Sequence, residues 1–186
     1  MSFADETLHT VNEKWKKNGN VTVNMVNGIK VITIRLTVSG PKFVIAESVA
    51  AEAERSWNGA TGTHDGQEYR VDAKFTAVES GGDWQGKYMR DSTRRNVAED
   101  LQKRGLYVNE TLNAVMSRVS GHNSRGSSIF SYYSSASDTW PHEFGHALGL
   151  THWRNCEGTG CVGAITSYSE IRKVSGAELA AIAGGY

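Results

Sequence analysis

The chain has no excess of charge of either sign, no long apolar run and only two prolines. Its 20 Lys and Arg are balanced by 20 Asp and Glu, so the basic surface that nucleic acids require is missing and we expect no nucleic-acid partner. No apolar run is long enough to predict a membrane span. Without repeats or a proline-rich linker, residues 1–186 predict one domain.

Cysteine is as scarce as proline, since only Cys156 and Cys161 occur. Four residues separate them. That spacing is too long for a CxxC redox motif, and two cysteines are too few for a four-cysteine zinc site. A disulfide that closes the glycine-rich loop between them is the favoured interpretation, and two free thiols are the alternative.

What the sequence does contain is a dense group of metal-binding residue types between positions 142 and 152. His142 and His146 are four residues apart, so on a helix they lie on one face and can bind one ion. Glu143 follows the first histidine and can reach a water at that ion. Gly149 can adopt the positive φ that ends a helix, which lets the chain turn back and present His152 as a third ligand.

Three histidine ligands predict a single catalytic zinc ion, because a tetrahedral zinc then keeps one open position. A bare HExxH can arise by accident, as two surface histidines beside a solvated glutamate. The longer pattern fixes five residues, and its chance occurrence in a chain of this size is below about one in ten thousand. We therefore expect a zinc site of the catalytic type.

Around this motif, the order of predicted elements indicates an α+β fold. Asn27-Gly28 between two β-rich runs predicts a hairpin. The helix with the motif is expected to begin at Asp138 or Thr139, with Pro141 in its first turn. The other predicted helices cover 4–18, 44–57, 92–104, 110–119 and a closing segment that starts with the capping box at 175–178, and the predicted strands cover 21–26, 29–38, 69–78 and 127–133.

The full pattern HExxHxxGxxH resembles that of the metzincin clan of zinc endopeptidases. The residues within it that are also similar to those of bacterial serralysins and vertebrate matrixins are Gly145, Ala147, Leu148, Gly149 and Leu150. The resemblance implies a metzincin-like domain with a twisted, mainly parallel sheet above an active-site helix and a short C-terminal subdomain with a closing helix. The upper subdomain would span about residues 1–152 and the lower about 153–186.

The clan also has a methionine-containing turn beneath the zinc, and here the similar stretch is 164–169. Thr166 occupies the methionine's place, which puts the apolar floor of the site in doubt. We expect Thr166→Met to raise thermal stability or zinc affinity. Tyr168 lies two residues later, where the resemblance implies a hydroxyl that reaches the metal or the oxyanion. A half-buried core tyrosine is the alternative.

These expectations make a zinc metalloendopeptidase the leading hypothesis, with Glu143 as the general base and protein or peptide as substrate. Partly from the resemblance, we expect the substrate to add as a strand along Ser128, Ile129 and Phe130. An amidase on cell-wall peptides shares this chemistry and is the first alternative. The second is a binding module that keeps the metal fold without turnover, which Thr166 favours and the intact Glu143 disfavours.

The surroundings of the motif lead to simpler expectations. We interpret His9, His64 and His122 as solvent-exposed, the charges between 90 and 104 as a solvated helix face, and Trp140 and Trp153 as packing residues.

The beginning of the chain lacks the basic start and apolar core of a signal peptide. A monomeric protease of this kind would be extracellular or a delivered effector, and a protein inhibitor would accompany an effector.

Overall fold

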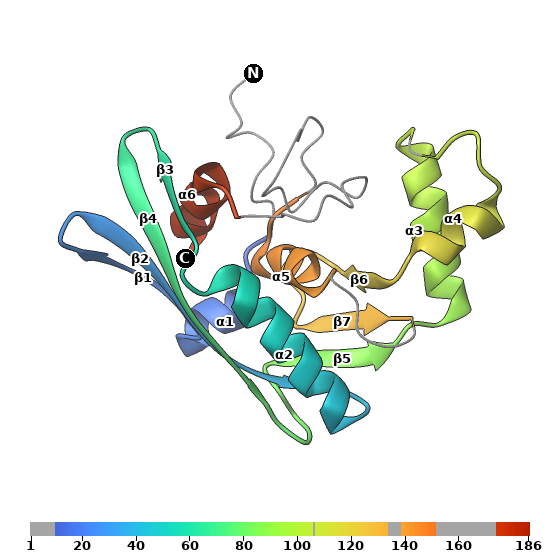
Figure 1. Ribbon diagram of the computed structural model, residues 1–186, viewed down its shortest axis with the longest axis horizontal. Helices are drawn as coiled ribbons and strands as arrows, with labels where there is room; N and C mark the ends of the chain where they lie inside the picture. The colour runs from blue at the N-terminus through green and yellow to red at the C-terminus, as the bar shows by residue number, and fades with distance from the viewer. Residues whose placement is uncertain (1–9, 106, 134–138, 152–173) are drawn as a thin grey trace.

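The computed structural model describes residues 10–105, 107–133, 139–151 and 174–186. A curled mixed sheet forms its centre, with helices against one face and at its ends (Figure 1). The α+β class predicted from the sequence is confirmed. Within the described ranges, every helix is too short or too polar to cross a lipid bilayer.

The sheet has the strand order β3-β4-β2-β5-β7-β6, and β1 pairs with β2. Neighbours among β4, β2, β5 and β7 run parallel, whereas β1, β3 and β6 join antiparallel. The sheet is therefore mixed, where a mainly parallel one was expected. The strands are β1 (Val21–Val26), β2 (Ile29–Ser39), β3 (Thr61–His64), β4 (Gln67–Ala77), β5 (Trp84–Tyr88), β6 (Gly121–Asn123) and β7 (Ile129–Tyr132).

The predicted hairpin at Asn27-Gly28 is confirmed. Both residues have positive φ, 50° and 81°, which a two-residue turn between twisted strands requires. Register then pairs Val26 with Ile29 and Val21 with Ile34. The turn sequence thus sets the alignment of the first two strands.

The helices agree with the prediction except at the start of the chain. The first begins at Glu13, because the side chain of Asn12 accepts a hydrogen bond from the Trp15 amide and acts as the N-cap. Residues 10–12 are therefore not helical, contrary to expectation. The helices are α1 (Glu13–Asn18), α2 (Phe43–Trp57), α3 (Asp91–Lys103), α4 (Leu112–Arg118), α5 (Trp140–Leu148) and α6 (Gly176–Gly185).

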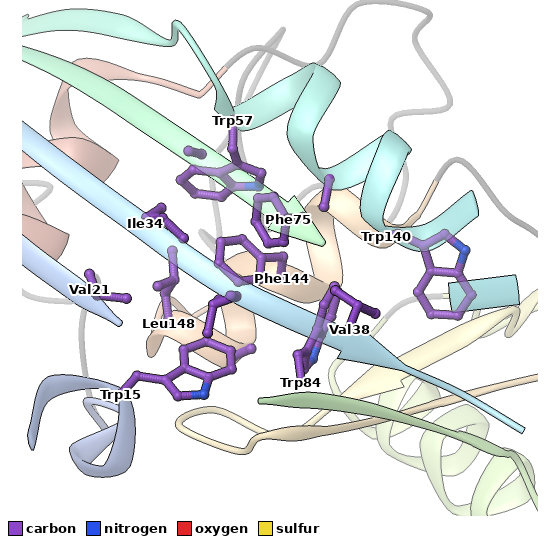
Figure 2. Packing of buried hydrophobic residues seen from close by; sticks show 14 of the residues in the cluster. Trp15, Val21, Ile34, Val38, Trp57, Phe75, Trp84, Trp140, Phe144 and Leu148 are labelled. Carbon is purple, nitrogen blue, oxygen red and sulfur yellow. The ribbon is translucent and has the colours of Figure 1, made fainter. Parts of the chain in front are cut away.

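The main core forms where α2 and α5 pack against the sheet, and its centre is Phe144 (Figure 2). The Phe144 ring lies 4.8 Å from Phe75 and 5.3 Å from Trp84, edge-on in both cases. Trp15 and Trp57 complete the shell at 5.7 and 5.5 Å. Since Phe144 directly follows Glu143, the residue that anchors the helix also fixes the direction of the motif side chains.

A second, smaller core lies between α3 and α4, beyond the ends of β5 and β7 (Figure 1). It contains Met89, Ala98, Leu101, Val115 and Val119. Helices α3 and α4 form one wall of a pocket, and α5 forms the wall opposite.

Candidate metal centre

Helix α5 has the start and the end that its sequence predicts. Pro141 lies in its first turn and Thr139 occupies the N-cap position, although its hydroxyl does not cap the helix. Gly149 ends the helix with φ 117°, and the Leu150 amide donates to the Gly145 carbonyl at 2.9 Å. The predicted glycine stop is confirmed, so the chain turns back immediately after the helix.

His142 and His146 point towards one another, and their Nε2 atoms are 3.1 Å apart. The two rings stand nearly perpendicular, at 81°. Two nitrogens bound to one tetrahedral zinc at about 2.0–2.1 Å lie about 3.3 Å apart, so the observed separation fits a shared ion. The same distance also suits an N–H···N hydrogen bond between neutral rings.

The tautomer of His146 is fixed by its other nitrogen, which lies 2.8 Å from the Leu150 carbonyl oxygen. That oxygen can only accept, so Nδ1 carries the proton and Nε2 presents its lone pair towards His142. Burial lowers the pKa of His146 to about 4, and the Leu150 contact opposes this only in part. The ring is therefore neutral at pH 7, as metal binding requires.

Glu143 is buried and lines the same pocket as the two histidines, a cavity of about 240 Å³. Strand β6 passes close to it at Gly121. A side-chain carbon at position 121 would lie 3.4 Å from Cγ of Glu143 and 3.2 Å from the Trp140 ring. Glycine thus lets the strand approach the carboxylate. Gly121 could not be recognised from the sequence, since one glycine in a polar run carries no signal.

The expected substrate edge is wrong. Ser128 precedes β7, which includes Ile129 and Phe130 and is paired on both sides. Ile129 is the partner of Gln85 in β5, and Phe130 is the partner of Asn123 in β6. Sequence analysis missed β6 because it has only three residues, Gly-His-Asn, without β-forming side chains.

Strand β6 is itself the last strand on this side of the described sheet. The Tyr133 amide donates to the Ser120 carbonyl at 3.0 Å, so these two residues form a hydrogen-bonded pair. The next pair, Gly121 with Tyr132, is then not hydrogen-bonded, and the two types alternate along β6. In an antiparallel pair with this register, the backbone groups of Gly121 and Asn123 point away from β7. Within the described residues this edge of β6 is unpaired, and Gly121 and Asn123 line the same pocket as Glu143.

His122 is not the solvent-exposed histidine that the sequence suggested. It is half-buried and lines the pocket, and burial lowers its pKa although the charge of Asp100 raises it. Asp100 and Arg104 also line the pocket, so this part of the expected solvated helix face belongs to the site. The interpretation of His122 was wrong because the elements that cover it are distant in sequence, whereas Asp100 and Arg104 are exposed, as expected of a solvated helix face.

Other predictions about single residues have mixed outcomes. Trp140 is fully buried and packs on Phe130 and Tyr132, as expected of a packing residue. His64 is half-buried beside Asp65 at 3.4 Å, so it is less exposed than expected.

The remaining predicted positions lie outside the described residues: His9, Asp138, His152, Trp153, Cys156, Cys161, Thr166 and Tyr168. The structure thus brings together His142, Glu143 and His146 of the predicted site. Among the described residues, no three His, Cys, Asp or Glu side chains surround one point as metal ligands would. Comparisons with known protein families, curated proteins and solved structures gave no match.

Proposed function

We propose that the protein is a zinc-dependent metalloendopeptidase. The observation that carries the proposal is the pair of Nε2 atoms 3.1 Å apart on His142 and His146, in the same pocket as the buried Glu143. The resemblance of the full motif to that of metzincins supports it and adds His152 as the third ligand. By the same resemblance, the sheet and α5 would belong to a metzincin-like upper subdomain, with residues 153–186 below.

The proposed chemistry combines residues that line the pocket, His142, Glu143 and His146, with His152 and Tyr168, which the resemblance adds. A zinc ion held by the three histidines would acidify a water and polarise the substrate carbonyl. Glu143 takes the proton of the attacking water and delivers it to the leaving amine. Tyr168 would donate its hydroxyl to the developing oxyanion, a role that rests on the resemblance alone.

The open edge of β6 suits a peptide as substrate. An extended peptide can pair with the outward backbone groups of Gly121 and Asn123, and main-chain hydrogen bonds would hold it regardless of its side chains. Gly121 keeps this strand close to Glu143, so a peptide bond on β6 would lie within reach of the carboxylate. We place the substrate strand here in preference to β7.

The test is cleavage of casein or a peptide library by the purified protein, with a chelator and with zinc added back. We expect a chelator to abolish cleavage and zinc to restore it. Glu143→Ala should remove activity by a factor of about 100 or more while zinc stays bound. Glu68→Ala, at an exposed position on β4, is the matched control and should cleave normally. Normal cleavage by Glu143→Ala would refute the assigned base.

We also propose an extracellular or effector location for this protease and, with it, a protein inhibitor. Both rest on the expected activity. Co-expression with genes beside its own would test the inhibitor, because a true inhibitor should stop casein cleavage at equimolar amounts. Cleavage unchanged by every neighbouring product would contradict it.

A further inference from the structure

The pocket beside the motif has an unequal charge distribution, although the chain as a whole is neutral. Three arginines line it, and they come from three different elements: Arg104 at the end of α3, Arg118 in α4 and Arg125 in the turn after β6. Among the described lining residues, the carboxylates are Asp100 and Glu143. Because Glu143 is the proposed general base, Asp100 is the one described carboxylate of the lining that remains to balance the three arginines.

Two of these arginines already have carboxylate partners. Nε of Arg104 lies 2.8 Å from Asp100, and the Arg118 guanidinium lies 2.6 Å from Glu110. Arg125 forms no ion pair with any described residue. It is exposed at the rim of the pocket. Among the described arginines of the pocket, Arg125 is thus the one without a carboxylate partner, so its charge can attract an anionic group.

The turn that presents Arg125 is held against the motif helix. The Gly126 amide donates to the His146 carbonyl at 3.0 Å, and the Ser127 amide donates to the Ser124 carbonyl at 3.0 Å. The backbone of Arg125 is therefore fixed beside the motif helix, and its side chain lines the same pocket as His142 and His146.

The position of Arg125 along β6 relates it to the substrate. It lies in the turn two residues after Asn123, whose backbone groups point away from β7, and it lines the same pocket as Gly121 and Asn123. A peptide paired with Gly121 and Asn123 would bring one of its side chains to Arg125. A planar guanidinium binds a carboxylate through two parallel hydrogen bonds, which a neutral amide cannot match.

We propose that Arg125 is a specificity-determining residue that selects peptides with an acidic side chain near the cleaved bond. This inference rests on the proposed peptidase function and names the substrate class of the same pocket. Arg104 adds positive potential from the opposite wall while remaining paired with Asp100. The preference is electrostatic, so it should weaken as salt rises.

The experiment uses pairs of peptides that differ only by Asp against Asn, or Glu against Gln, at each position around the cleaved bond. At low salt, we expect the acidic member to have a kcat/KM about fivefold higher at one position, the scale of a partly exposed ion pair. Arg125→Gln should remove the difference, Arg125→Glu should reverse it and Arg125→Lys should keep part of it. Equal ratios in the parent and in Arg125→Glu would overturn the inference.

A binding measurement separates this inference from the peptidase proposal. The same peptide pairs are titrated against the inactive Glu143→Ala protein, where the acidic member should bind about fivefold more tightly. Arg70→Glu, an exposed arginine on β4, has the same charge change and should leave the ratio intact. If Glu143→Ala binds the acidic peptide more tightly through Arg125 but the parent protein cleaves no peptide, the peptidase proposal alone is refuted. Cleavage with no charge dependence in binding or kcat/KM would refute the role of Arg125 alone.

Discussion

The two walls of the pocket differ in how they are built. The α5 wall carries the motif and is anchored in the main core, where four aromatic rings surround Phe144. The opposite wall consists of α3 and α4 around a small cluster, together with the three-residue β6. Since buried apolar area supports an element roughly in proportion to its extent, the motif wall should be the more rigid one. The groups proposed for catalysis thus lie on the firmly held side, and the turn with Arg125 is hydrogen-bonded to the same side at His146, whereas Arg104 lies on the other wall.

The largest expected effect is on the anchor of the motif wall. Phe144→Ala should lower the free energy of unfolding by about 3–5 kcal/mol, because it removes the ring at the centre of the aromatic shell. Leu101→Ala in the opposite wall should cost less, about 2 kcal/mol. Denaturant unfolding of both variants makes the comparison. A greater loss for Leu101→Ala would contradict the proposed difference between the walls.

A second test uses the pH dependence of the metal-free protein. The pKa of His146 is lowered to about 4 in the folded state from an ordinary 6.5, so the unfolded chain binds the proton first as pH falls. Its contribution is therefore complete above about pH 6.5 and is lost between 6.5 and 4, by up to about 3 kcal/mol. Denaturant titrations across this range should show the loss. His146→Gln should flatten that dependence, and a flat parent curve would contradict the buried neutral ring.

A smaller effect is expected where the two walls meet. Gly121→Ala places a carbon 3.2 Å from Trp140 and 3.4 Å from Glu143, so neighbouring atoms must shift slightly. We expect a loss of about 1 kcal/mol in stability and a clearly larger loss in kcat/KM, because the shift moves the carboxylate. Thermal unfolding together with kinetics separates the two effects. Gly184→Ala, where a side-chain carbon meets nothing nearby, is the control. Unchanged kinetics in Gly121→Ala would show that β6 does not position Glu143.

Sequence analysis could predict the elements whose signals are local. Asn27-Gly28 specifies its turn through backbone conformation alone, and Ser175 caps α6 together with Glu178 in the predicted box. Gly149 ends α5 for a similar local reason. In each case, a few adjacent residues contain all the necessary information.

The elements that depend on distant partners could not be predicted. Strand β6 exists because it pairs with β7, and its own three residues have no preference for that conformation. Because β6 pairs with β7, the described sheet ends at Gly121–Asn123 and not at Phe130, where the edge was expected. The same holds for His122, whose burial results from packing between α3 and the motif helix region. Consequently α5, α3 and α4 were predicted as separate helices, whereas β6 and the pocket that these elements form together were not.

The central claim is that His142 and His146, with His152, bind one zinc ion. X-ray absorption spectroscopy on the zinc-loaded protein, with the metal content measured in the same sample, tests it most directly. We predict one zinc per chain with three imidazole nitrogens at about 2.0–2.1 Å, and loss of the metal in His146→Ala. A protein that retains no zinc, or one whose zinc has no imidazole ligands, would contradict the account.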